Sequence, residues 1–214
     1  MRLATALLAV TALGATAVPS MAHEVVYRAA LNGASEFPTN DSAGTGSARV
    51  TFDVDLYKMR VEVSFSGLTG NTTNSHIHCC TATSGLGGDA AASLAGNVGV
   101  ATRTPTFLDF PAGVTFGSYD KTYDMLDLGS YNPAFVTANA GGAIDDLHKA
   151  QNAFDALVNG AAAGKAYLNI HSSYKSGGEI RGFLAPVPEP ETYALMLAGL
   201  GLVGWAAKRR ARVC

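Results

Sequence analysis

Apolar and polar residues alternate over several short stretches of the chain, and this alternation predicts β-strands. Residues 25–31, 49–55 and 59–65 each carry an apolar side chain at every second position. A period of two puts the apolar side chains on one face of a strand and the polar ones on the other. Residues 56–58 connect the second and third stretches, so we expect a hairpin within an antiparallel meander.

A further strand pair is predicted at residues 166–171 and 179–184. A loop rich in serine and glycine separates the two stretches, as in a hairpin. In the first stretch Tyr167, Asn169 and His171 share one face, because side chains alternate along a strand. These strands are expected to join the same antiparallel arrangement.

One helix is predicted at about residues 144–159, where apolar side chains recur at steps of three and four. Asp145 and Asp146 stand near its positive N-terminal end, and Gly160 follows as a C-cap. We expect this helix to form a lid over one end of the strands.

The segments between these elements lack a lasting period. Residues 81–99 are rich in glycine and small side chains and predict a long surface excursion. Residues 103–135 contain three prolines and predict irregular loops with short strands. About seven short strands and one helix indicate an all-β fold, an antiparallel Greek-key-like sandwich or barrel with one lid helix.

The N-terminus has the pattern of a targeting segment. Residues 1–22 combine Arg2, an apolar run and small residues at the end, which is typical of a cleaved secretory signal peptide. The β-domain, residues 23–186, is then expected outside the cytoplasm.

The remaining residues, 187–214, form a tail of three parts. A proline-rich acidic stretch precedes an apolar segment at 193–207, predicted to be a hydrophobic transmembrane helix. Its roughly 15 helical residues reach about 23 Å, less than the ~30 Å hydrocarbon core, so interfacial anchors are needed. The predicted membrane anchors are one tryptophan and four cations: Trp205, Lys208, Arg209, Arg210 and Arg212. The cations keep this end cytoplasmic, and the tail crosses the inner membrane at least transiently.

Composition narrows the possible functions. Residues 24–186 contain ten Lys or Arg and fifteen Asp or Glu, a balance of −5. Nucleic-acid binding needs clustered cations that displace counterions from phosphates, so no nucleic-acid partner is expected. The sequence shows no nucleophile beside a base, no acids paired as in glycosidases and no phosphate loop, and we expect a protein that is not an enzyme.

The sharpest chemistry lies in residues 75–80. His76 and His78 project from the same face of a predicted strand, and His171 lies on another. Imidazole suits copper or zinc, so these histidines are candidate metal ligands. The alternative is that no cofactor is bound and the rings hydrogen-bond backbone and loop groups at the rim of the fold.

Two cysteines, Cys79 and Cys80, follow directly. Adjacent Cα atoms are ~3.8 Å apart, closer than the about 5.5–6 Å of ordinary disulfides, so a bridge between them is awkward. A strained bridge, free thiols, intermolecular disulfides and soft copper ligands beside the histidines all remain open.

The tail resembles the PEP-CTERM protein-sorting signal of Gram-negative bacteria that make exopolysaccharide. Pro188, Glu189 and Pro190 match its motif, and the apolar and basic parts follow in order. The resemblance implies recognition by an exosortase-type membrane protease and cleavage near the motif. Release to the cell surface or extracellular matrix would follow, with exopolysaccharide as a further partner.

The part between the targeting segments, residues 23–186, resembles a CHRD domain, the module named from chordin. The matching positions include residues 31–33, 75–78, 167–171 and 178–184. The resemblance implies an extracellular β-sandwich or barrel and no settled activity. We therefore expect a binding or structural role at the cell surface or in the exopolysaccharide matrix.

The histidine pattern supplies a second hypothesis. A His-X-His strand followed by a distant strand histidine is similar to the copper-binding arrangement of Cu/Zn superoxide dismutases. The further zinc ligands and the bridging arrangement of that family have no obvious counterpart in this sequence. The alternative function is therefore a periplasmic or surface copper- or zinc-binding protein, with redox activity as an open question.

Overall fold

The computed structural model describes residues 23–142, 145–187, 198–200 and 208. Among these residues, no helix has the length and apolar character needed to cross a membrane. Several predicted features lie outside the described residues: the signal peptide at 1–22, the motif Pro188, Glu189 and Pro190, most of the segment 193–207, and Trp205, Arg209, Arg210 and Arg212.

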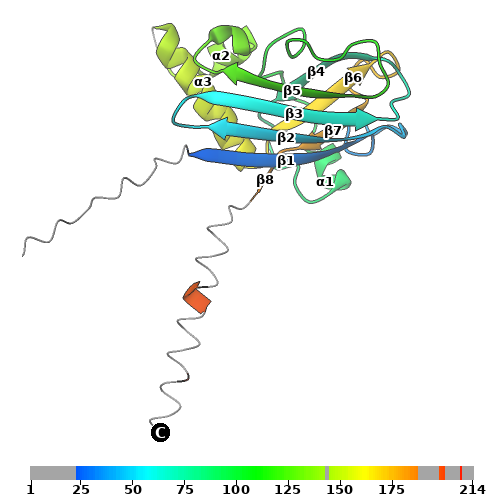
Figure 1. The fold of residues 1–214 in the computed structure, drawn as a ribbon, viewed down its shortest axis with the longest axis horizontal. Helices are drawn as coiled ribbons and strands as arrows, with labels where there is room; N and C mark the ends of the chain where they lie inside the picture. Colours follow the sequence, from blue (N-terminus) through cyan, green and yellow to red (C-terminus); the bar gives the residue numbers. More distant parts are fainter. Residues whose placement is uncertain (1–22, 143–144, 188–197, 201–207, 209–214) are drawn as a thin grey trace, which may run out of the picture.

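Eight strands form one sheet in which every pair is antiparallel (Figure 1). Their order across the sheet is β4-β6-β7-β1-β2-β3-β5, and β8 pairs with β1. The strands are β1 (Glu24–Asn32), β2 (Thr45–Asp53), β3 (Lys58–Ser66), β4 (Thr72–His78), β5 (Gly117–Asp124), β6 (Tyr167–Ser172), β7 (Ile180–Phe183) and β8 (Ala185–Pro186).

The sheet curls into a half-barrel, so that β4 and β6 lie behind β3 and β5 in Figure 1. The loop between β4 and β5 bonds to β4: Phe107 N donates to Ser75 O at 3.1 Å and Thr72 N donates to Val114 O at 2.8 Å. The predicted antiparallel all-β class is confirmed, with the strands in one curled sheet.

The pairing of β1, β2 and β3 follows the predicted alternation. β1 runs against β2 over nine residue pairs, from Glu24 opposite Asp53 to Asn32 opposite Thr45. The predicted hairpin between β2 and β3 is present and closes where Asp53 pairs with Lys58. Lys58, expected in the connection, is the first residue of β3, so the connection is residues 54–57. This register turns the apolar positions of all three strands toward the interior.

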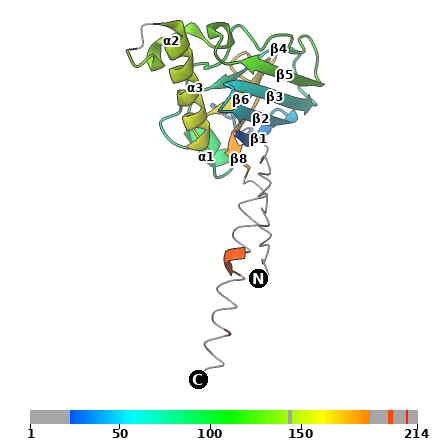
Figure 2. The same cartoon turned by 60° about the vertical axis from the view of Figure 1, so that its left-hand side comes forward.

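The predicted lid helix is present as α3 (Asp146–Ala162) and extends beyond the expected end at residue 159. Asp145 is its N-cap, and the carboxylate accepts a hydrogen bond from the backbone N–H of His148 at 3.0 Å. Figure 2 shows α3 beside the sheet. Its Phe154 ring packs edge-on against Phe52 of β2, with ring centroids 5.8 Å apart, which joins the helix to the core.

Two further α-helices lie in segments for which the sequence predicts only irregular structure. They are α1 (Asp89–Leu94) and α2 (Pro133–Asn139), and a short 3₁₀ helix, η1 (Leu128–Ser130), precedes α2. The prediction is wrong at these positions because the helices are too short to show a period. For α2 a local signal exists: the Asn132 side chain caps it and proline occupies its first turn.

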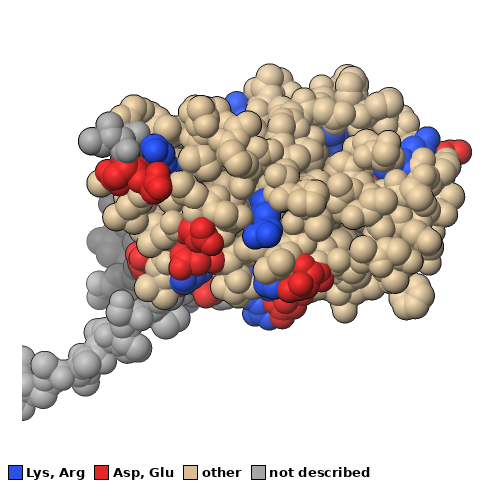
Figure 3. Space-filling view, turned by 90° about the horizontal axis from the view of Figure 1, so that it is seen from above, with Lys and Arg blue, Asp and Glu red and all other residues tan. Residues whose placement is uncertain are grey.

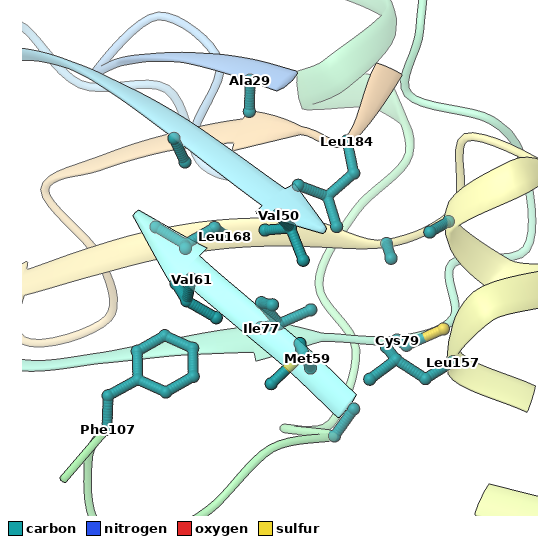
Figure 4. Packing of buried hydrophobic residues seen from close by; sticks show 14 of the residues in the cluster. Ala29, Val50, Met59, Val61, Ile77, Cys79, Phe107, Leu157, Leu168 and Leu184 are labelled. Carbon is teal, nitrogen blue, oxygen red and sulfur yellow. The ribbon is translucent and has the colours of Figure 1, made fainter. Parts of the chain in front are cut away.

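The core lies between the curled sheet and α3, and the β4 and β6 side chains that enter it alternate with the polar ones. Ile77 and Leu168 are fully buried and pack with Val61 and Met59 of β3. Figure 4 shows this cluster, with Leu157 of α3 at its edge. Because Ile77 faces the core, its two histidine neighbours project from the opposite face of the sheet.

Charged side chains on the β2, β3 and β5 face are paired. Arg60 contacts Asp120 at 2.6 Å and Glu62 at 3.2 Å, and Lys58 lies 3.0 Å from Asp124. On the side of the molecule drawn in Figure 3, blue and red atoms lie next to one another. Neighbouring carboxylates therefore offset much of the positive charge on these strands.

The two ends of the β-domain are held together. β8 pairs with β1, with Pro186 opposite Tyr27, and Val187 N donates to Val26 O at 2.8 Å. The chain thus enters and leaves the domain at neighbouring points.

Candidate metal centre

Strands β4 and β6 place three histidines on one face of the sheet, away from the core. His76 lies opposite Asn169 in the register, His78 lies opposite Tyr167, and His171 lies opposite Asn74 of β4. Because side chains two residues apart share a face, this antiparallel register gathers the three rings around Asn169. The sequence prediction that they share a site is thereby given a definite geometry.

The three rings converge. One ring nitrogen from each of His76, His78 and His171 can be chosen so that all three lie within 4.8 Å of one another. His76 Nδ1 and His171 Nε2 are 3.3 Å apart. The residues are 4%, 7% and 8% exposed, respectively, so this is a buried cluster and not a solvated rim.

Backbone carbonyls fix the tautomer of each ring. His76 Nε2 lies 2.5 Å from Pro105 O, His78 Nδ1 lies 2.8 Å from Val98 O, and His171 Nδ1 lies 2.8 Å from Ser176 O. A carbonyl oxygen only accepts hydrogen bonds, so each of these nitrogens carries the ring proton. The other nitrogen of each neutral ring then holds a lone pair that is free to bind a cation.

The environment keeps the rings neutral. Burial lowers the pKa of His76 to about 4, and the nearby His171 adds to this while the bond to Pro105 opposes it. Burial likewise lowers the pKa of His78 to about 4, and it lowers the pKa of His171. Metal binding requires deprotonated imidazole, so the site is in its binding form at neutral pH without paying for proton release.

The spacing suits a first-row metal ion. Zn–N bonds of about 2.0–2.1 Å in a tetrahedron put neighbouring nitrogens roughly 3.3 Å apart. The separation of His76 Nδ1 and His171 Nε2 has this value. His78 Nε2 is buried and has no hydrogen-bond partner among the described residues, so the lone pair of this nitrogen is free to complete the set.

The ring of His78 is held from its other side by Tyr167. The two rings stack with centroids 4.8 Å apart and an angle of 5° between their planes. Together with the bond from Nδ1 to Val98 O, the stack fixes both the tilt and the rotation of the imidazole. Such support of a ligand by neighbouring groups is usual at metal sites.

Arg181 of β7 holds the segment that carries Val98. Its guanidinium donates to Ala92 O at 2.7 Å, to Gly96 O at 3.0 Å and to Asn97 Oδ1 at 2.9 Å. The Arg181 side chain is fully buried, so these bonds are shielded from water. Arg181 therefore positions His78 indirectly, through the chain that follows α1.

Glu36 is the carboxylate beside Arg181. Its Oε2 lies 3.8 Å from Arg181 Nε, and both side chains are buried. Burial raises the pKa of Glu36 to about 7, and the positive charge of Arg181 opposes this. Glu36 Oε1 is buried and lacks a hydrogen-bond partner among the described residues.

The prediction that cysteine thiolates join the histidines as metal ligands is wrong in this structure. Cys79 and Cys80 form a disulfide with each other, so neither sulfur is a thiolate that binds a metal. Cys79 also turns toward the core beside Leu157 (Figure 4), on the other side of the sheet from the histidines. A Cβ added at Gly160 of α3 would collide with both sulfurs, which shows how closely the disulfide packs on that helix.

Sequence reasoning did not assign Glu36, Asn169 or Arg181 to this site. Asn169 lies two residues before His171, on the same strand face, so the alternation along β6 already indicates that it points to the cluster. The three orienting carbonyls belong to loops, two of them 20 or more residues from the ring they bond, and no side-chain pattern reports them. The sorting motif and the predicted anchors other than Lys208 lie outside the described residues.

Comparison with protein-family models gives two matches. The CHRD domain model matches residues 27–184, and the PEP-CTERM protein-sorting motif model matches residues 186–210. No curated protein and no solved structure matches the chain. The motif implies export and sorting to the cell surface through exosortase, a membrane protease. Since the first match covers most of its length, the chain belongs to the CHRD domain family and carries a PEP-CTERM sorting motif at its C-terminal end.

Proposed function

We propose that this protein is a surface-sorted metal-binding protein that holds one copper or zinc ion between His76, His78 and His171. One observation supports this most strongly: each ring bonds a backbone carbonyl through one nitrogen, and the other nitrogens of His76 and His171 lie 3.3 Å apart in the same cluster as the unpartnered Nε2 of His78. Two lone pairs 3.3 Å apart repel each other in a buried site. A cation between them turns that repulsion into attraction.

The alternative, that the rings serve only to hydrogen-bond the backbone, explains the position of one nitrogen of each ring. Bonds to Pro105, Val98 and Ser176 use one nitrogen of each ring. This alternative does not explain why the remaining nitrogens converge away from water, since a buried polar atom without a partner costs about 1–3 kcal/mol. A metal ion accounts for both nitrogens of each ring.

The role we propose is binding without catalysis. All three histidines are more than nine-tenths buried, which favours an ion that is held over an ion that meets a substrate. Copper and zinc suit imidazole ligands, and copper binds more tightly in general. The CHRD domain and the sorting motif support a place at the cell surface; we extend this to the exopolysaccharide matrix of a Gram-negative bacterium.

Metal analysis of the exported chain, purified without a histidine tag, tests the proposal. We expect about one copper or zinc ion per chain in wild type and far less in His76→Ala, His78→Ala and His171→Ala. The matched control is His148→Ala on α3, an exposed histidine that pairs with Asp145 at 2.7 Å; it should keep the metal. A folded wild-type protein without stoichiometric metal after reconstitution would refute the proposal.

A further inference from the structure

Asn169 occupies the centre of the histidine face. It lies on β6 between Tyr167 and His171 and opposite His76 of β4. Asn169 is 2% exposed, and its Oδ1 is buried with no hydrogen-bond partner among the described residues. An amide oxygen buried in this way costs about as much as a lost hydrogen bond. The structure thus contains a second atom at the site, besides His78 Nε2, that is buried and has no partner among the described residues.

The surroundings of Asn169 indicate which end of its amide faces the histidines. On one side the amide contacts the ring of His78. On the other side, a Cβ added at Gly178 would lie 2.9 Å from Asn169 Nδ2 and 2.5 Å from Glu36 Oε1, so the NH₂ group and the carboxylate share one small space. The NH₂ group thus lies on the Glu36 side of the amide, and Oδ1 lies on the histidine side.

Oδ1 of Asn169 and Nε2 of His78 are then two acceptors on neighbouring side chains. Neither atom carries a proton to share, because the His78 proton is on Nδ1, bonded to Val98 O. Both atoms are buried and unpartnered. A proton donor is missing on this side of the cluster, and a metal ion fulfils the same need for positive charge at both atoms.

We propose that Asn169 Oδ1 is the fourth ligand of the ion, which makes the site a four-coordinate set of three imidazole nitrogens and one amide oxygen. This inference rests on the proposed function. A fourth protein ligand fills the position that catalytic zinc sites leave to water or substrate. The centre would therefore hold its ion in a closed site, and Glu36 and Gly178 would act as positioning residues for the amide.

The test uses the full chain loaded with Cu(II) alone or Zn(II) alone, in wild type, Asn169→Leu and Asn169→Asp. The control is Asn152→Leu on α3, whose amide bonds Ala140 O and lies outside the site. Chelator competition gives the affinity. X-ray absorption of the zinc form and electron paramagnetic resonance of the copper form report the ligands.

We expect Asn169→Leu to lower the affinity at least about 100-fold, more than loss of an outer-sphere partner. The wild-type zinc spectrum should fit three imidazoles and one oxygen at about 2.0–2.2 Å. Asn169→Asp should retain the ion and change the copper spectrum, which keeps the test decisive if the leucine variant does not fold. Asn152→Leu should match wild type.

Two outcomes would overturn the inference, and they differ in what else they overturn. If wild type binds one ion and Asn169→Leu or Asn169→Asp has wild-type affinity and spectra, only the fourth ligand is wrong. If folded wild type binds no copper or zinc, the histidine site fails with it.

Discussion

The guanidinium of Arg181 lies over the ring of Tyr167, with Arg181 Cζ 4.6 Å from the ring centroid. Tyr167 also stacks on His78, so the contact continues to the histidine cluster. A cation over an aromatic face is favourable, and more so when water is excluded. Arg181 thus supports the histidine site in two ways, through its contact with Tyr167 and through the loop that carries Val98.

Removal of this cation should weaken both the fold and the site. Arg181→Met leaves Glu36 buried without its counter-charge, and we expect a loss of about 3–5 kcal/mol in the free energy of unfolding. Arg181→Lys keeps the charge but not the planar set of donors, so its loss should be smaller. Urea unfolding of the metal-free protein measures the loss of stability. The rate of zinc transfer to a chelator measures the effect on the site and should rise when His78 is held less firmly.

Arg60→Met is the matched control for Arg181. Arg60 is exposed and pairs with Asp120 on the sheet surface, where an ion pair contributes roughly 0–1 kcal/mol. An equal effect of the two substitutions would contradict the role given to Arg181.

Acid should destabilise the metal-free protein. His76 and His78 have pKa values lowered to about 4 in the fold, against about 6.5 in an unfolded chain. Between these values the unfolded state binds more protons, so the free energy of unfolding falls as pH drops from about 6.5 to 4. Each ring contributes on the order of 2–3 kcal/mol. Unfolding curves across this range measure the slope, and His78→Phe should reduce it.

Glu36 should act in the opposite direction. Its pKa is raised to about 7, so the folded state keeps a proton that the unfolded state releases above about pH 4.5. This contribution to stability is present below pH 4.5 and is lost as pH rises toward 7. Glu36→Gln removes it, and the variant should show a steeper gain of stability between pH 4.5 and 7 than wild type. An equal gain in the two proteins would show that Glu36 is ionised throughout this range.

The disulfide should be dispensable for metal binding. Cys79 and Cys80 lie beyond the last ligand of β4 and pack toward α3. The double variant Cys79→Ser, Cys80→Ser is therefore expected to retain the metal content and copper spectrum of wild type. If the double variant loses the ion but keeps the circular dichroism spectrum of wild type, the sulfurs take part in metal binding and this prediction is wrong.

Sorting should depend on the motif alone. Glu189→Ala is expected to block processing by exosortase, so that an uncleaved precursor collects in the membrane fraction. Glu191→Ala, one residue beyond the motif Pro188 to Pro190, should be processed normally. Immunodetection of the β-domain and of a C-terminal tag in membrane and surface fractions separates these results.

The elements that the sequence predicts well are those whose pattern repeats. Strands β1 to β3 alternate over seven or more residues, and α3 keeps its period over four turns. The shared face of His76 and His78 follows from the same alternation. Helix α1 has six residues, three of them alanine, and such a segment carries no period of its own.

The part of the site that the sequence does not predict is made by contacts between distant segments. Pro105, Val98 and Ser176 orient the rings through backbone oxygens, which every residue possesses. Arg181 stands in a short buried strand, where its charge is acceptable only because Glu36 and several carbonyls surround it. These are properties of the folded sheet, and they become visible only when the strand order is known.

The pairing of β8 with β1 limits the distance between the folded domain and the motif at which the sorting protease cuts. Val187 is still bonded to Val26, and Pro190 ends the motif three residues later. Three residues extend at most about 10 Å. A protease that cuts at the motif while the domain is folded must therefore work directly beside the first strand, and a bulky group attached at that edge would shield the bond from cleavage.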